Sequence, residues 1–187
     1  HLDFRRQRQM CIRDRYGIDT EECERFYSEL PGLVADSIED EHYAKAIFSI
    51  QEKASIEHVF VSEKWSKREP QIWPEDIMME IEMILQTINY PDVSLLEHLL
   101  TLDNLDTKRI SEWVHFSTNL YPIYTEKACD TLTKMGLDTP YRPDDMASYG
   151  LFVSRIEGLK IYAPAKGLPE IGLPRARMLQ LGLERFE

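Results

Sequence analysis

Residues 166–183 read Lys-Gly-Leu-Pro-Glu-Ile-Gly-Leu-Pro-Arg-Ala-Arg-Met-Leu-Gln-Leu-Gly-Leu. The Leu-Pro-Glu-Ile-Gly part predicts a tight turn, because proline fixes one backbone angle and glycine permits conformations that other residues avoid. The residues that follow predict a short helix that ends at a glycine. This helix carries one small residue, two apolar residues and the glycine, namely Ala176, Met178, Leu179 and Gly182. Such an order of turn and helix is typical of a helix-hairpin-helix.

A hairpin of this kind offers a site for a phosphate group. The backbone N–H groups of the turn and of the helix N-terminus point at the anion, and the helix dipole favours negative charge there. Arg175 and Arg177 add positive charge beside the turn. The pattern therefore predicts contact with a nucleic-acid backbone without base readout, and a plain turn between two helices is the alternative. The predicted contact residues are Lys166, Gly167, Leu168, Ile171, Gly172, Arg175 and Arg177.

Composition indicates a soluble globular protein of one domain, with at most a small appendage. The chain has 187 residues, of which 43% are hydrophobic and 29% charged, and no stretch approaches the roughly 18 apolar residues of a membrane helix. The three cysteines, Cys11, Cys23 and Cys129, have no metal-binding spacing and cannot all pair. They favour a reducing, cytoplasmic location over an extracellular one, with ordinary packing as the plainer interpretation.

Charge is distributed unevenly along the chain. Residues 1–15 carry five Arg and two acidic residues, residues 16–104 carry six Lys or Arg against twenty Asp or Glu, and residues 105–187 carry eleven of each. An acidic segment repels a phosphate backbone, whereas a neutral one need not. Any nucleic-acid contact is therefore expected after Leu105.

The N-terminal residues 1–15 have no apolar period and resemble translated sequencing-adapter sequence; a genuine basic arm is the alternative. At the other end, residues 183–186 suggest the start of a further element, so we expect the chain to be a fragment. Between the ends we expect a helical bundle over residues 16–143 and a truncated helix-hairpin-helix module over residues 144–187. The predicted fold class is all-α.

Helical periodicity supports this organisation. One helix is expected to begin at Ser37, capped in the manner of Ser37-x-x-Asp40, and a second follows the break at Pro70 and Pro74. Asp92 is a candidate N-cap for a short third helix. A long helix starting at Asp106 or Thr107 is expected to kink at Pro122 and to stop at Gly136. The last helix before the hairpin is expected to run from about Asp144 through Ile156.

Two Glu-x-x-His motifs suggest an alternative chemistry. In four-helix di-iron proteins, such pairs on two helices bind metal together with single Glu residues from the other two helices. The alternative ligand set is Glu39, His42, Glu82, Glu112 and His115. The motif also arises by chance in a chain this rich in Glu, so our main expectation is that the chain binds no metal.

No nucleophile with a spaced base and no phosphate-binding Gly-rich loop with Lys occurs in the sequence. The chain as given therefore contains no catalytic residues that we can assign and no ATPase motif.

From Leu105 onward the chain resembles the C-terminal region of archaeal superfamily-two DNA repair helicases. The resemblance rests on Arg109-Ile110-Ser111-Glu112-Trp113, on Tyr149-Gly150, and above all on the residues from Gly172 to Gly182. That family has a helical ratchet bundle with a Glu-Trp helix, followed by an Ile-Gly-x-x-Arg-Ala-Arg hairpin.

The resemblance implies that this chain is the DNA-guiding part of an ATP-dependent helicase. Trp113 would stack on an unpaired base and Arg109 would contact a phosphate of single-stranded or branched DNA. ATP and Mg²⁺ would belong to motor domains upstream, which are the expected protein partners. Two alternatives are a free-standing helix-hairpin-helix DNA-binding or repair protein and a ferritin-like di-iron carboxylate enzyme.

Overall fold

The computed structural model describes residues 19–48 and 53–187, and this part of the chain consists of helices with no strand. The predicted all-α class is therefore confirmed for these residues. In chain order the elements are α2 (Thr20–Val34), the 3₁₀ helix η1 (Ala35–Glu39), α3 (Glu41–Phe48), α4 (Ile56–Trp65), α5 (Glu75–Thr87), the 3₁₀ helix η2 (Ser94–Thr101), α6 (Thr107–Thr118), α7 (Glu126–Lys134), α8 (Met146–Ile161) and α9 (Arg175–Arg185). Among them, none has the length and apolar character that a membrane crossing requires.

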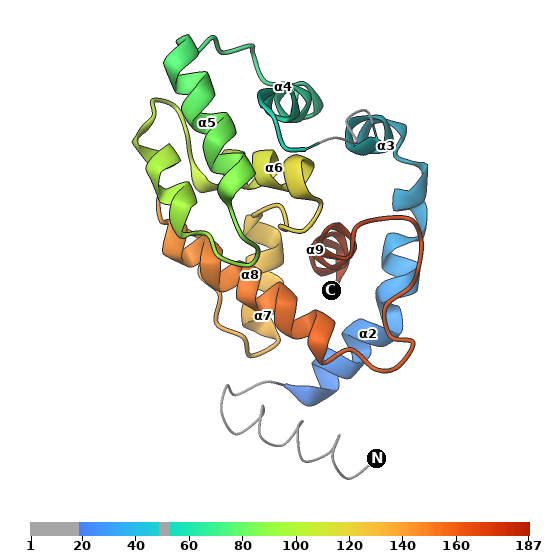
Figure 1. Ribbon diagram of the computed structural model, residues 1–187. Coiled ribbons are helices and arrows are strands. Elements are labelled where there is room, and N and C mark those ends of the chain that lie inside the picture. The colour runs from blue at the N-terminus through green and yellow to red at the C-terminus, as the bar shows by residue number, and fades with distance from the viewer. Residues whose placement is uncertain (1–18, 49–52) are drawn as a thin grey trace.

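Helix α9 occupies the middle of the molecule. Figure 1 shows it end-on, with α2 on one side and α7 and α8 on the other, and all three contact it. Its side chains Met178, Leu179 and Leu183 are fully buried. The predicted apolar ridge of this helix therefore forms part of the main core.

Gly182 has a different role from the predicted helix stop. It lies inside α9, three residues before the helix ends. A Cβ atom at this position would lie 2.3 Å from Cδ1 of the buried Leu30, on α2. The glycine therefore permits α2 and α9 to approach closely, which explains the residue without any helix termination.

The helix expected to start at Ser37 is divided in the structure. Ser37 lies within η1, and α3 begins after Asp40, whose Oδ1 accepts a hydrogen bond of 3.1 Å from the N–H of Tyr43. A separate helix, α4, begins at Ile56. The predicted cap at Ser37 is therefore wrong, and Asp40 supplies it.

The prediction for the next helix is confirmed, and that for the short helix after it is confirmed in part. Helix α5 begins after Pro74 and ends before Asn89. Asp92 then precedes η2, and its Oδ1 accepts a hydrogen bond of 2.9 Å from the N–H of Ser94. Helix α5 therefore follows the usual rule for proline. The N-cap position of η2 is occupied by Val93, which provides no side-chain cap, so Asp92 binds the start of this element from one residue earlier.

The long kinked helix expected from Asp106 is two helices. Helix α6 ends where Asn119 adopts the left-handed conformation with φ of 60°, and α7 begins after the cap residue Thr125. The predicted kink at Pro122 is therefore a complete break. The predicted stop at Gly136 is confirmed, since this glycine follows α7 with φ of 85°.

The segment 162–174 joins α8 to α9, and α8 continues five residues beyond the expected end at Ile156. Buried apolar side chains from α2, α5, α6, α7, α8 and α9 form one cluster. The predicted boundary between residues 143 and 144 therefore does not separate two cores. The proposed adapter segment 1–15 lies outside the described residues.

Candidate functional site

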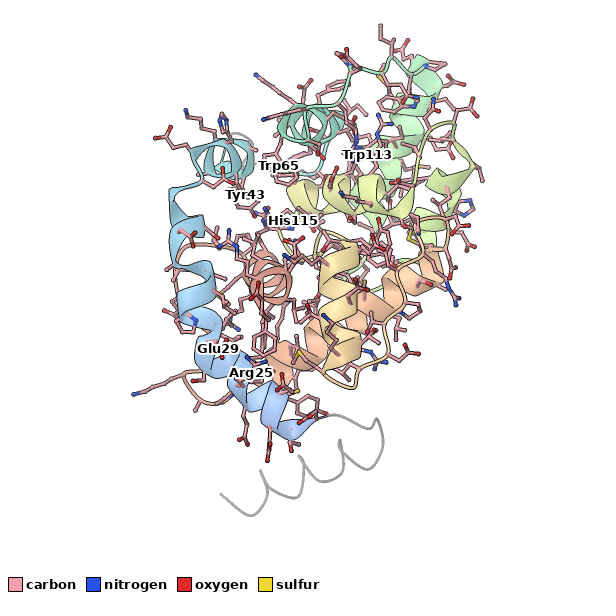
Figure 2. The ribbon with its side chains drawn as sticks, turned by 180° about the vertical axis from the view of Figure 1, so that it is seen from behind. Arg25, Glu29, Tyr43, Trp65, Trp113 and His115 are labelled. Atoms are coloured by element: carbon pink, nitrogen blue, oxygen red, sulfur yellow. The ribbon has the colours of Figure 1, made fainter. Side chains whose placement is uncertain are left out.

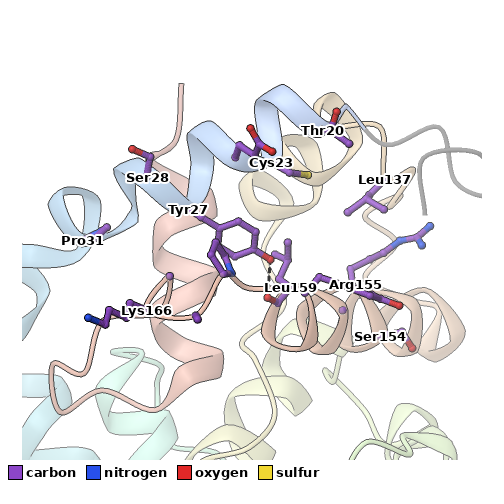
Figure 3. A pocket seen from close by; sticks show the side chains of 16 residues that line it. Thr20, Cys23, Tyr27, Ser28, Pro31, Leu137, Ser154, Arg155, Leu159 and Lys166 are labelled. Carbon is purple, nitrogen blue, oxygen red and sulfur yellow. Dashed lines mark hydrogen bonds between the residues drawn. The ribbon is translucent and has the colours of Figure 1, made fainter. Parts of the chain in front are cut away.

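A cavity of about 940 Å³ lies between α2, the second half of α8 and the segment that follows α8 (Figure 3). This volume falls at the upper end of the range of small-molecule sites, roughly 300–1,000 Å³. Its lining is mainly apolar. The lining residues are Thr20, Cys23, Glu24, Tyr27, Ser28, Pro31, Leu137, Ser154, Arg155, Gly158, Leu159, Tyr162, Pro164, Ala165, Lys166 and Gly167.

The wall on α2 is one stripe of that helix, because its residues recur at intervals of three and four. Asp19 fixes the start of this helix, since its Oδ1 accepts hydrogen bonds from the N–H groups of Glu21 and Glu22 at 3.0 and 3.2 Å. The opposite face of α2, with Phe26 and Leu30, packs into the core. Helix α2 therefore covers the core on one side and lines the cavity on the other.

Gly158 leaves space in the wall on α8. A Cβ atom at Gly158 would meet nothing within 4 Å. By contrast, a Cβ atom at Gly167 would lie 2.5 Å from Cδ of Pro164. The Gly167 N–H donates a 2.8 Å hydrogen bond to the Pro164 carbonyl, which closes a tight turn at the cavity edge. The two glycines thus shape the cavity in different ways.

Two polar side chains in the cavity wall, Tyr27 and Cys23, are not set up for nucleophilic chemistry. The Tyr27 hydroxyl donates a 2.6 Å hydrogen bond to the Leu159 carbonyl and joins the two walls (Figure 3). Burial, followed by the nearby carboxylates of Asp19, Glu22 and Glu24, raises the pKa of the Cys23 thiol to about 11. Since the thiolate is the nucleophilic form, Cys23 is a poor nucleophile near neutral pH.

The structure contradicts the predicted DNA contacts of the Arg-Trp helix. Trp113 is fully buried, and its Nε1 donates a 2.6 Å hydrogen bond to Glu63 on α4. Arg109 is only 8% exposed and binds the same carboxylate through Nε and Nη2, at 2.9 and 2.7 Å. A buried ring cannot stack on a base, and this guanidinium is already paired. Both predicted roles are therefore wrong.

The hairpin residues are divided between buried and exposed positions. Arg177 is only 8% exposed, and Leu168 and Ile171 pack against the core. These three side chains are therefore not exposed for contact with a DNA strand. The Gly167 N–H is used in its own turn, so it is not free to donate to a phosphate in this conformation. The exposed members of the predicted set are Lys166, Gly172 and Arg175.

The alternative metal ligands do not form a site in the described part of the chain. Glu112 contacts Ser66 and Arg68, and Glu82 accepts a 2.9 Å hydrogen bond from the Ile56 N–H. His42 is exposed, while the Glu39 side chain lies outside the description. Within the described residues, no group of three His, Cys, Asp or Glu side chains is placed to hold a metal ion.

His115, the fifth alternative ligand, belongs to an aromatic cluster with Tyr43 and Trp65 (Figure 2). Its Nδ1 lies 2.7 Å from the Tyr121 carbonyl, which can only accept, so Nδ1 carries the proton. Its Nε2 then accepts a 2.7 Å hydrogen bond from the Tyr43 hydroxyl. Both ring nitrogens are occupied, and complete burial lowers the pKa of His115 to about 3.

The buried histidine predicts a pH dependence of stability. The unfolded chain takes up a proton near pH 6.5, whereas folded His115 remains neutral until about pH 3. Stability therefore falls as pH drops below 6.5, by at most about 1.4 kcal/mol per pH unit from this group. Urea unfolding at pH 7, 6 and 5 measures the slope, and His115→Gln should remove most of it. Burial also lowers the pKa of His58, so a small slope remains; an unchanged slope would contradict the account.

The sequence pattern reveals neither the partner of Arg109 and Trp113 nor the cavity. Glu63 is one of many acidic residues, and nothing in its neighbourhood distinguishes it from a solvated one. The stripe of α2 at positions 20, 23, 24, 27, 28 and 31 is visible as helical periodicity. Its mixture of small, polar and apolar residues does not indicate which element lies opposite.

No protein-family model, characterised protein or solved structure matches the chain.

Proposed function

We propose that this protein binds a small molecule with an apolar body and one anionic group in the cavity between α2 and α8. The observation that carries the proposal is the cavity of about 940 Å³ with its mainly apolar lining. Large concave apolar sites with few polar groups are the usual form of small-molecule sites. An apolar body would gain about 25 cal/mol for each Å² of its surface removed from water.

The charges around the cavity favour an anionic group on the ligand. Lys166 and Arg155 lie at different ends of the cavity, and Glu24 is the acidic residue in its lining (Figure 3). Lys166 is exposed, and Nη2 of Arg155 donates a 3.0 Å hydrogen bond to the Asp138 carbonyl. A ligand anion beside the exposed Lys166 would be attracted by its positive charge, and the anion would keep part of its hydration shell. We propose binding rather than covalent catalysis for two reasons. The raised pKa of Cys23 keeps its thiol protonated, and the Tyr27 hydroxyl is held in its hydrogen bond to the Leu159 carbonyl.

Filling the cavity tests this proposal. The probe is 8-anilinonaphthalene-1-sulfonate, which combines an apolar ring system with one negative charge and fluoresces in apolar surroundings. Gly158→Trp should weaken probe binding at least about tenfold, or 1.4 kcal/mol, because its side chain enters the open space beside Gly158. Gly32→Trp is the matched control. Gly32 also has nothing within 4 Å of an added Cβ, and it does not line the cavity.

Two results would count against the proposed function. The first is equal probe binding by both glycine variants. The second is probe fluorescence that appears only when near-ultraviolet circular dichroism is lost, because that combination marks a loosely packed state rather than a site. Melting temperatures of the variants serve as a check that both remain folded.

Nucleic-acid binding is a second candidate, favoured by the exposed Lys166 and Arg175 and by the start of α9. Pro174 provides no side-chain cap for that helix, so its first N–H groups suit an anion. Against this candidate, residues 16–187 carry a net charge of −14, which repels DNA. If it holds, ATP and Mg²⁺ belong to a helicase motor outside this chain. Arg175→Ala should then reduce the slope of log K against log salt by about 0.7–0.9, and an unchanged slope would exclude the residue.

A further inference from the structure

A second, smaller pocket of about 220 Å³ lies between η1, the start of α3 and α9. This pocket is distinct from the cavity between α2 and α8, because no residue lines both. Its polar lining includes Asp36, Ser37, Asp40, Arg177 and Arg185.

Arg177 is a buried cation held in a fixed position. Its guanidinium carbon lies 5.1 Å from the ring centre of Tyr43 and 5.3 Å from that of Trp65. Its Nη1 donates a 2.7 Å hydrogen bond to Oε1 of the buried Gln180. Cation–π contacts and one amide oxygen hold the guanidinium, but they do not neutralise its charge.

Two buried polar atoms at this pocket have no hydrogen-bond partner. They are Nε of Arg177 and Oγ of Ser37, whose residues are 8% and 7% exposed. Buried polar groups in folded proteins are nearly always hydrogen-bonded, and each exception costs free energy. Both residues line the same pocket, so a single ligand group with acceptor atoms could satisfy both.

The other charged groups of the pocket have hydrogen-bond or ion-pair partners of their own. Arg185 forms an ion pair with Asp36 at 3.1 Å, and Oδ1 of Asp40 accepts the Tyr43 N–H at the start of α3. Among the ion pairs of the described residues, none includes Arg177. The carboxylates of Glu184 and Asp40 attract Arg177 from a greater distance. A buried guanidinium without a carboxylate in direct contact is costly in free energy, and a bound anion would relieve that cost.

We propose that this pocket binds the carboxylate group of a small molecule. One carboxylate oxygen accepts from Nε of Arg177 and the other from the Ser37 hydroxyl, so that both polar atoms gain a hydrogen-bond partner. A single negative charge fits better than the double charge of phosphate, because Asp36 and Asp40 line the same pocket.

Acetate, the smallest stable carboxylate with a methyl group, is the probe for the test, with inorganic phosphate in a parallel titration. The Nε–H signal of Arg177 is followed by ¹⁵N NMR in the full chain. Acetate is expected to shift this signal with saturation, and phosphate is expected to act more weakly. Arg177→Met should weaken acetate binding at least about tenfold, followed by calorimetry, and Ser37→Ala should weaken it severalfold.

Arg175→Met is the matched control, since Arg175 lies exposed two residues earlier on the same helix; its acetate affinity should be unchanged. Ser37→Ala removes only a hydroxyl and keeps the test decisive if Arg177→Met fails to fold. The proposal would be overturned by a Nε–H signal that does not move, by tighter binding of phosphate than of acetate, or by equal acetate binding in Ser37→Ala.

Discussion

The Glu63→Ala variant is expected to lose about 3–5 kcal/mol of unfolding free energy, because it leaves a buried charge without its partner. Glu63 lies on α4 and accepts hydrogen bonds from two residues of α6, through Nε and Nη2 of Arg109 and through Nε1 of Trp113. Without Glu63, the Arg109 guanidinium remains buried but has no carboxylate partner. The hydrogen bond that remains, to the Asn104 carbonyl at 3.0 Å, and the contacts with the rings of Trp73 and Trp113 do not replace a carboxylate.

Urea unfolding at neutral pH measures this loss. Glu57→Ala is the matched control, since Glu57 lies exposed on the same helix, and its effect should stay within about 0.5 kcal/mol. The double variant Glu63→Met with Arg109→Met should be more stable than Glu63→Ala, because it leaves no uncompensated charge. A loss below about 1 kcal/mol in Glu63→Ala would show that the pair does not hold α4 against α6.

The Trp113→Ala variant is expected to lose about 3–5 kcal/mol, in the range of large buried aromatic side chains. The ring is fully buried and meets Trp73 edge to face, with ring centres 5.4 Å apart. Its removal leaves a cavity beside Arg109 and takes one donor from Glu63. The tryptophan fluorescence should also be insensitive to single-stranded DNA, because base stacking requires an exposed ring.

Urea unfolding and a DNA titration of the wild-type protein test the two parts of this prediction. Leu120→Ala serves as a comparison, since Leu120 is 48% exposed just after α6 and should cost little. Fluorescence quenching by DNA that disappears in Trp113→Ala, together with a small loss of stability, would restore the stacking role.

The sequence predicts several helix boundaries but not the surroundings of helix α6. Proline, aspartate and glycine mark the ends of α5, η2 and α7, because caps and breaks are local interactions. Helix α6 is different, since every residue from Arg109 to Phe116 is buried. Its polar side chains suggest a solvent-facing side, yet they are satisfied by partners from distant segments, such as Glu63 for Arg109 and Tyr43 for His115.

The same reason explains why the hairpin pattern predicts more exposure than the structure has. Arg177 follows an exposed Arg175 by two residues, and periodicity alone cannot tell which of them faces the core. The contacts of Arg177 with Tyr43 and Trp65 depend on how α3 and α4 pack against α9. The cavity between α2 and α8 likewise depends on a separation of helices that no local pattern encodes.

The most direct test of the proposed binding site is an NMR map of a bound apolar anion. Decanoate combines a long apolar tail with one carboxylate, and its tail protons can be distinguished from those of a ¹³C-methyl-labelled protein. We predict intermolecular nuclear Overhauser effects from the tail to the methyl groups of Leu137, Leu159 and Ala165, which line the large cavity. Effects to Leu173 and Leu181 instead, which line the smaller pocket, or no effects under saturating ligand, would contradict the account.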